Sequence, residues 1–321
     1  MKLKKLSALG IGFAGLDIIK YNKQELILPG GTCANVLSVL SSVLNWSSDI
    51  VKCKYNDVWD RYIDALWSSI GVNVLECHDV DFGIPRVVQT IRGTEQHSYT
   101  TCPYCHTKLV KIVLPTERKI KISIEKKEYD LLFFDRISPG TKYLLDLFNQ
   151  QDKWTFYEPN GMRIYKTWVK NISTCDIVKF SDSRIPKLYY EKLIQDLNNM
   201  QHKTKIIIIT HAEKGFSYSL VSKGELSMFK TIPVSPFQQV LDPSGAGDWA
   251  SAGFIHKFLQ SYHTPTEEID EKSIVDSLIF GHSLAEIGCN SIGALGKIFK
   301  DKESNKPHVS GVCEFCKSNM I

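Results

Sequence analysis

A string in the last third of the chain, Asp242-Pro-Ser-Gly-Ala-Gly-Asp248, stands directly before a predicted helix. Its successive small residues Gly245, Ala246 and Gly247 let the backbone come close to a ligand and leave their amide groups unpaired. An anion can accept hydrogen bonds from these amides and is attracted by the positive end of the helix dipole. The string therefore predicts a phosphate-binding turn.

Asp248 follows on the first turn of the same helix. The helix dipole favours an ionised carboxylate there, and this carboxylate can accept a proton from an alcohol while a phosphoryl group is transferred to that alcohol. In the structural alternative, Gly-Ala-Gly is only a tight turn and Asp248 only stabilises the helix start. For the string taken alone, both alternatives are open.

The string resembles the DTxGAGD signature of the PfkB, or ribokinase-like, family of carbohydrate and nucleoside kinases, and nearly the whole chain follows the family's order of motifs. The matching landmarks are Asp17 at the end of the first predicted strand, Gly30-Gly31-Thr-Cys-Ala-Asn35, Glu158-Pro-Asn-Gly-Met-Arg163 (resembling DPNxR), Thr210-His-Ala-Glu-Lys-Gly215 (resembling TxGxxG), residues 242–248, and Asn290 with Gly293 and Ala294.

This resemblance implies ATP-dependent transfer of the γ-phosphoryl group to a primary hydroxyl of a small carbohydrate, with Mg²⁺ bridging the phosphates; a nucleoside is the alternative acceptor. Asp248 matches the family's base, and Gly245, Ala246 and Gly247 match its anion hole. Asp17, Gly31 and Asn35 match positions that hold substrate hydroxyls, for which carboxylate and amide groups are suited. The positions that match nucleotide-binding ones are Thr210, Gly215, Asn290 and Gly293, and those that match a monovalent cation (K⁺) site are Asp242 and Ser244.

Several positions depart from the family pattern, among them the stretch 56–60, which lacks an expected glycine. Lys179-Phe-Ser-Asp182 stands where the family commonly carries Asn-x-x-Glu to organise magnesium waters, so Lys179 either binds phosphate directly or marks a weakened metal site. Glu158 stands where Asp is usual, and Pro243 replaces a hydroxyl residue. These departures keep open an alternative of another class, a catalytically weak ligand-binding or interaction protein with the same fold.

Two Cys-x-x-Cys pairs, Cys102 with Cys105 and Cys313 with Cys316, lie far apart in the sequence. Four thiolates in such pairs suit a structural Zn²⁺ site. A disulfide within each pair and unrelated thiols are the alternatives. Because nine cysteines is an odd number in a long chain, we expect reduced thiols and a cytoplasmic location.

Composition sets wider limits. The 321 residues are 43% apolar and carry a net charge of +4, too mild and too evenly spread to require nucleic acid or a membrane as partner. No segment reaches the roughly 18 uninterrupted apolar residues of a membrane helix. Lys2, Lys4 and Lys5 before an apolar stretch imitate a secretory signal, whereas residues 6–17 also fit a buried first strand.

The apolar patterns predict one α/β domain over residues 1–321, with a doubly wound, mostly parallel sheet and helices on both of its faces. A small β lid is expected from about 18–28 and 84–114, including a strand at 111–114, and lid strands can pair two copies in a homodimer. Residues 118–128 are expected to be a solvated loop and strand edge, and about 300–321 a cysteine-containing tail. The predicted helices are 33–44, 58–70, 142–148 and 187–197, and the main strands are 130–134, 154–157, 176–180 and 206–209.

Overall fold

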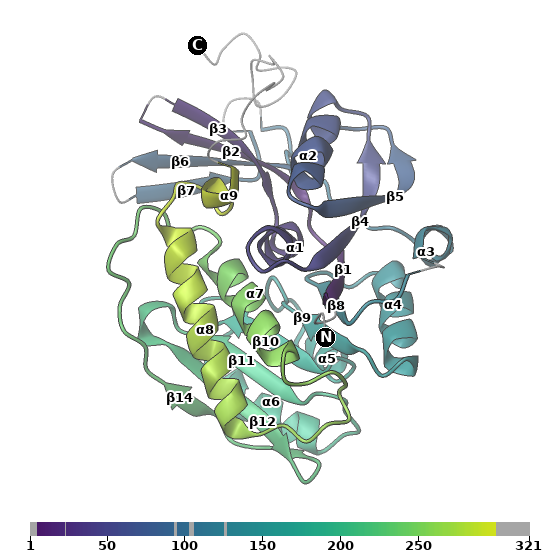
Figure 1. Ribbon diagram of the computed structural model, residues 1–321, viewed down its shortest axis with the longest axis vertical. Helices are drawn as coiled ribbons and strands as arrows, with labels where there is room; N and C mark the ends of the chain where they lie inside the picture. The colour runs from purple at the N-terminus through teal and green to yellow at the C-terminus, as the bar shows by residue number, and fades with distance from the viewer. Residues whose placement is uncertain (1–4, 23, 93–94, 103–105, 125–126, 300–321) are drawn as a thin grey trace.

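The computed structural model describes residues 5–22, 24–92, 95–102, 106–124 and 127–299, and its centre is a ten-stranded mixed sheet (Figure 1). The order is β13-β12-β11-β10-β9-β8-β1-β4-β5, with β14 paired to β12. Neighbours from β11 to β5 are parallel, and β12 is antiparallel to β11. The strands are β1 (Ser7–Ile11), β4 (Ser47–Tyr55), β5 (Val72–Val80), β8 (Leu131–Phe134), β9 (Trp154–Tyr157), β10 (Ile177–Ser181), β11 (Ile206–Thr210), β12 (Phe216–Ser222), β13 (Glu225–Leu226) and β14 (Lys230–Ile232).

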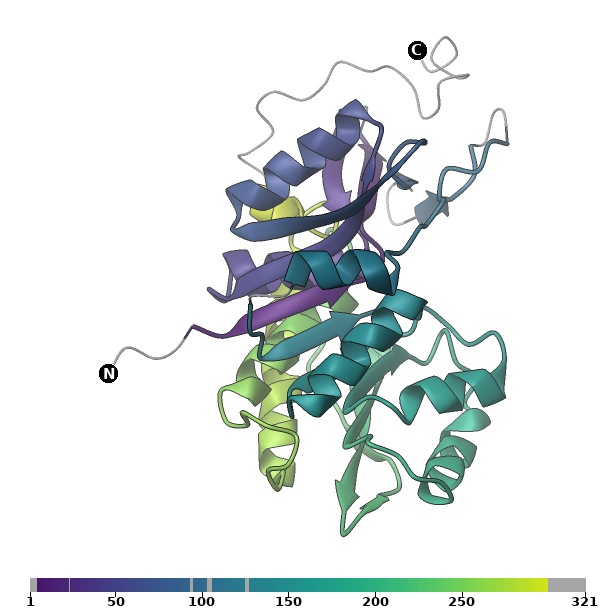
Figure 2. The ribbon, with the colours of Figure 1, turned by 90° about the vertical axis from the view of Figure 1, so that its right-hand side faces the viewer.

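Helices cover both faces of this sheet, as Figure 2 shows from the side. In β11, Ile206 and Ile208 pack into one apolar core and Ile207 and Ile209 into the other, which explains why the strand is apolar throughout. The predicted α/β class is thus confirmed. The first core includes α1 (Thr32–Ser42), α2 (Val58–Ser69), α7 (Ala246–Leu259), α8 (Glu271–Cys289) and α9 (Gly296–Phe299); the second includes α3 (Glu117–Ile124), α4 (Pro139–Gln150), α5 (Tyr165–Ile172) and α6 (Tyr189–Asn198).

A four-stranded sheet lies at one end of the molecule (Figure 1). Its order is β3-β2-β6-β7, formed by β2 (Gly15–Tyr21), β3 (Gln24–Gly30), β6 (Arg86–Arg92) and β7 (Glu95–Tyr99). These strands come from the two stretches for which the sequence predicts a lid. That the sheet acts as a lid, or pairs two copies, stays a prediction.

The predicted first strand is wrong in its extent. β1 ends at Ile11, and the chain then enters the small sheet at Gly15, so Asp17 lies on β2 rather than at the end of β1. The break falls at Gly12, where a Cβ atom would lie 1.9 Å from Oδ1 of Asp135. The close approach of this carboxylate, which is distant in the sequence, turns the chain out of the main sheet.

Two further sequence predictions are wrong in the segment 111–124. Residues 111–114 form no strand, and Glu117–Ile124 forms helix α3 rather than a solvated loop. Ile120 and Ile124, four residues apart, are buried, and Ile120 packs at Gly140 of α4. This spacing places two apolar side chains on one helical face inside an otherwise charged segment. Within the described residues, no helix is long and apolar enough to span a bilayer.

Close packing of α7 against α8 fixes the helix that begins with the predicted phosphate turn. A Cβ atom on Gly253 would lie 2.7 Å from Cα of Gly281, and a Cβ atom on Gly281 would lie 2.5 Å from the carbonyl oxygen of Ala250. The two helix backbones therefore approach each other through glycine, and a methyl group at either position would push α7 away from α8.

We predict that Gly281→Ala lowers the free energy of unfolding by about 1–3 kcal/mol, because overpacking forces the two helices apart. Chemical denaturation measures this loss. Ser283→Ala, an exposed change on the same helix, is the matched control and should stay close to wild type. Equal stability of Gly281→Ala and the control would contradict the packing described.

Candidate active site

Several polar side chains gather where parallel strands end at one edge of the main sheet. Asp135 follows β8, Glu158 follows β9, Asp182 follows β10 and His211 follows β11. In open α/β sheets, ligands bind outside the carboxyl ends of the strands. The candidate site combines this edge with the amino-terminal ends of α1 and α7.

The turn before α7 has the backbone conformation that its glycines allow. Gly245, the N-cap residue, has φ 76°, and a Cβ atom on it would lie 2.5 Å from Cβ of Ala294. One detail of the sequence prediction is wrong, since the amide of Ala246 donates to the carbonyl of Pro243 at 3.1 Å. Within the described chain, the amides of Gly245 and Gly247 have no such acceptor. Two of the three predicted donors therefore remain for an anion.

Asp248 is buried on the first turn of α7 and accepts a hydrogen bond at Oδ2 from Nδ2 of Asn35, at 2.6 Å. The pKa of Asp248 is raised to about 7, chiefly by burial and to a smaller extent by the charge of Glu158. The hydrogen bond from Asn35 and the charge of Lys179 lower the pKa in opposition. A carboxyl group with a pKa near neutrality suits a proton acceptor.

Two buried oxygen atoms near this pair lack hydrogen-bond donors within the described chain. They are Oδ1 of Asn35 and Oδ2 of Asp135, and the second has only the Arg136 guanidinium at 3.4 Å. Oδ1 of Asp135 accepts from the amide of Phe13 at 2.8 Å. Buried acceptors without donors are costly, so hydroxyl groups of a ligand would stabilise them. Asp135 belongs to no sequence motif; its only signal is an acid directly after an apolar strand.

Asp17 lies on β2, where the small sheet meets the start of α1. A Cβ atom on Gly30 would lie 2.3 Å from Cγ of Asp17, so only glycine fits there. Gly31 begins α1 with φ 103° and lies against the carbonyl of Phe13. Burial raises the pKa of Asp17 to about 7, with a smaller contribution from the charge of Asp242. Its role toward substrate stays a prediction.

The carboxylate of Asp242 connects two loops. It accepts hydrogen bonds from the amides of Ser244 and Gly293, both at 2.8 Å. Gly293 has φ 80°, and a Cβ atom on it would lie 2.4 Å from Cδ1 of Ile19 on β2. The loops are thereby held against the small sheet. Asn290 is the exposed C-cap residue of α8. The cation and nucleotide roles of these positions stay predictions.

A second polar chain follows β10 and β11. Oδ2 of Asp182 lies 2.8 Å from Nδ1 of His211, whose Nε2 lies 2.8 Å from Oγ of Ser217. The amide of Asp182 donates to the carbonyl of Thr210, and Gly215 closes the turn with φ 99°. The structure thus brings Asp182, Thr210 and Gly215 together. Their contact with a nucleotide stays a prediction.

The sequence and the fold of this chain are similar to those of known kinases. The family model described as pfkB family carbohydrate kinase matches residues 142–298. The resemblance to the PfkB family is confirmed. No curated protein sequence matches the chain.

Solved kinase structures show the same fold over nearly all of the chain. The ribokinase of Giardia lamblia has a TM-score of 0.71 at 15% identity, covering 92% of this chain and 96% of that one. A fructokinase double mutant from Vibrio cholerae O395, bound to fructose, ADP and a potassium ion, has a TM-score of 0.67 at 14% identity, covering 92% and 96%. Aminoimidazole riboside kinase from Salmonella enterica has a TM-score of 0.64 at 14% identity, covering 91% and 96%. At these identities the likeness establishes a ribokinase-like fold.

Two departures from the PfkB pattern contact each other. Nζ of Lys179 donates to Oε1 of Glu158 at 2.6 Å, and Oγ of Ser251 on α7 donates to Oε2 of the same carboxylate at 2.6 Å. Both members of the ion pair are buried. A Cβ atom on Gly247 would lie 3.6 Å from Nζ of Lys179, so the ammonium group lies beside the first turn of α7.

Most of the predicted zinc ligands lie outside the described residues. Cys105, Cys313 and Cys316 cannot be placed there, whereas Cys102 is buried and its amide donates to the carbonyl of Thr107 at 2.8 Å. A zinc ion shared by the two pairs stays a prediction.

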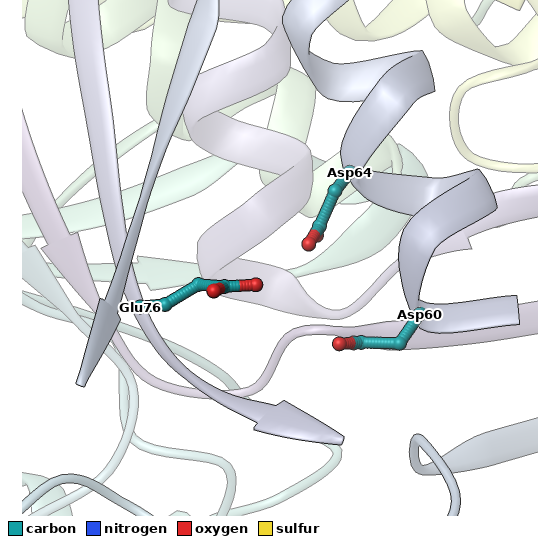
Figure 3. Close-up of side chains that lie close together, drawn as sticks. All are labelled: Asp60, Asp64 and Glu76. Carbon is teal, nitrogen blue, oxygen red and sulfur yellow. The ribbon is translucent and has the colours of Figure 1, made fainter. Parts of the chain in front are cut away.

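Three acidic side chains outside the PfkB motifs also lie together, as Figure 3 shows. Asp60 and Asp64 of α2 and Glu76 of β5 have carboxylate oxygens within 4.8 Å of one another. Nζ of Lys52 lies 2.7 Å from Oδ1 of Asp60 and 3.2 Å from Oδ1 of Asp64. The lysine already supplies positive charge to this cluster, which fits a structural ion-pair network.

We predict that Asp17→Asn stabilises the ligand-free protein at pH 8 by on the order of 1–3 kcal/mol. The folded-state pKa of Asp17 is raised, so its ionisation costs stability as the pH rises from about 4 to about 7. Denaturant unfolding at pH 4 and pH 8 measures the difference, which should be smaller at pH 4. The exposed change Asp276→Asn is the control, and destabilisation of Asp17→Asn at pH 8 would contradict the assignment.

Proposed function

We propose that this protein is an ATP-dependent kinase that phosphorylates a primary hydroxyl of a small carbohydrate. The observation that carries the proposal is the contact between Asn35 and Asp248, beside the available amides of Gly245 and Gly247. This arrangement combines a buried proton acceptor with donors for the charge of a phosphoryl group. The resemblance to the PfkB family and the shared fold with kinases of sugars and a riboside support it.

The chemistry follows from these positions. Asp248 accepts the proton of the acceptor hydroxyl, and that oxygen forms a bond to the γ-phosphorus of ATP as the bond from phosphorus to the ADP oxygen breaks. The amides of Gly245 and Gly247 donate hydrogen bonds to phosphoryl oxygens, and the dipole of α7 stabilises their charge. Asn35 fixes the position of the Asp248 carboxylate.

Buried acceptors favour a polyhydroxylated substrate. Asp17, Oδ1 of Asn35 and Oδ2 of Asp135 can each accept a hydrogen from a hydroxyl group. A nucleoside is the second candidate, because the aromatic ring of Phe13 lies beside Gly31 and offers a surface for stacking. The hydroxyl groups of a ribose would donate to these buried oxygen atoms whether the ribose is a free sugar or part of a nucleoside.

The side chains beside the phosphate turn are better suited to bind the phosphates of ATP than to hold a metal ion by themselves. The ammonium of Lys179 lies at the phosphate turn, and Glu158 already accepts from two donors. Mg²⁺ bound to the ATP phosphates would supply further charge neutralisation. Asp242 and Ser244 form the proposed K⁺ site. The proposed nucleotide contacts are Asp182, Thr210, Gly215, Asn290 and Gly293. We propose the cytoplasm as the location of the activity.

We predict acceptor-dependent ATP consumption in a screen of sugars and nucleosides with the full chain. Asp248→Asn should lower turnover by at least about a hundredfold, because the amide cannot accept the hydroxyl proton. Asp276→Asn, which removes an exposed carboxylate from α8, is the matched control and should retain wild-type turnover.

The pattern of acceptors decides between a sugar and a nucleoside. Wild-type protein that binds sugars or ATP without any acceptor-stimulated turnover would support the alternative of a binding protein and contradict the kinase. Turnover that survives in Asp248→Asn would contradict the assigned base.

We also predict that wild-type turnover falls as the pH drops below about 7, since Asp248 must be ionised to accept a proton. Asn35→Ala removes the hydrogen bond that lowers the pKa of Asp248, so the acidic limb should move to higher pH. Initial rates between pH 5 and pH 9 measure the shift. Ser42→Ala at the end of α1 is the control, and an unchanged limb in Asn35→Ala would refute the coupling.

A further inference from the structure

Two changes that look independent in the sequence form one buried ion pair. Glu158 follows β9 and Lys179 lies on the neighbouring strand β10, and their charged atoms are 2.6 Å apart. The Lys179 side chain is 4% exposed and the Glu158 side chain 10% exposed. The two departures from the family pattern therefore complement each other. The positive charge of Lys179 is balanced by Glu158, and the longer side chain of glutamate, compared with aspartate, reaches the ammonium group.

Strand periodicity points Lys179 toward the phosphate turn. Val178 and Phe180 belong to the apolar core on the far face of the sheet, so the side chain of Lys179 emerges on the face covered by α7. There its ammonium lies 3.6 Å from the position of a Cβ atom on Gly247. The helix start thus has a buried cation beside its available amides.

The ammonium group retains hydrogen-bonding capacity. It has three N–H donors, and Oε1 of Glu158 is its one acceptor among the described residues. Glu158 is held on its other oxygen by Ser251, so the carboxylate fixes the lysine in place. A buried ion pair is often no more stabilising than apolar side chains of similar size, so stability alone is a weak reason for this pair.

We propose that Lys179 is a built-in cation of the nucleotide site that contacts phosphate oxygens of ATP directly, with Glu158 and Ser251 as its positioning residues. The inference rests on the proposed kinase function and assigns part of the phosphate charge to the protein rather than to Mg²⁺. Its consequence is that the protein binds ATP in the absence of divalent metal. Binding of metal-free ATP then depends on the charge at position 179.

Isothermal titration calorimetry of the full chain tests this with two probes, ATP in EDTA and ATP with excess Mg²⁺. Lys179→Met should weaken binding of metal-free ATP by about tenfold or more, the loss expected for a charge-assisted hydrogen bond. Binding of Mg·ATP should weaken less, and Lys179→Arg should retain most of the affinity for metal-free ATP. The control Lys192→Met removes an exposed lysine of α6 that pairs with Asp196, and should match wild type.

A second variant separates binding from folding. Lys179→Met leaves Glu158 buried without its partner and can therefore unfold the protein. The double variant Glu158→Gln with Lys179→Met removes both charges and should fold, yet it should still bind metal-free ATP at least about tenfold more weakly than wild type.

Wild-type affinity for metal-free ATP in the double variant would overturn the role of Lys179, and the kinase proposal would stand if acceptor-stimulated turnover persists. If the wild-type protein binds ATP neither in EDTA nor with excess Mg²⁺, both the kinase proposal and this inference are overturned. Weak binding of metal-free ATP by wild type, alongside tight binding of Mg·ATP, would overturn the inference alone.

Discussion

The hydrogen bond between Asn35 and Asp248 is the interaction on which the site depends. It joins the first turns of α1 and α7, which come from distant parts of the chain, at a distance of 2.6 Å. Because each side chain is held by its own helix, packing of both helices on the main sheet sets the position of the carboxylate. Gly31 and Gly245 begin these helices in conformations with positive φ, so the backbone turns directly into the site. The fold thus positions one carboxylate against one phosphate-binding turn.

Buried negative charge is the cost of this arrangement. Asp17, Asp135, Asp242, Asp248 and Glu158 are all buried around the strand ends and helix starts. Burial raises the pKa of Asp17, Asp135 and Asp248 above the usual range of a carboxyl group. Such a site is poorly stabilised without a ligand, and hydroxyl donors or cations relieve it. The same carboxylates therefore link substrate binding to the stability of the folded state.

Sequence motifs located the helix starts because few residue types fit them. Gly-Ala-Gly before α7 and Gly-Gly before α1 are required by backbone geometry, and Asp248 and Asn35 have fixed places behind them. The hydrogen bond from the Ala246 amide to the Pro243 carbonyl depends on the conformation of this turn, which the sequence motif does not specify. Asp135 lacks a motif because its role comes from the neighbouring positions of β1 and β8.

Other features depend on contacts between distant segments. Lys179 and Glu158 each appear as a departure until the pairing of β9 with β10 places them together. The break after β1 depends on the approach of Asp135 to Gly12. In β12, Ser217 and Ser219 alternate with larger apolar or aromatic residues, a strand pattern that differs from the continuous apolar runs by which the other strands were predicted. Periodicity predicted the continuous apolar strands and failed where tertiary contacts decide.

The most direct test of the central claim is the titration of the Asp248 carboxyl group by ¹³C NMR, assigned by comparison with Asp248→Asn. Burial beside Glu158 predicts a midpoint near pH 7 in the ligand-free protein. A midpoint near pH 4, the value of an exposed aspartate, would contradict the buried proton acceptor at the start of α7.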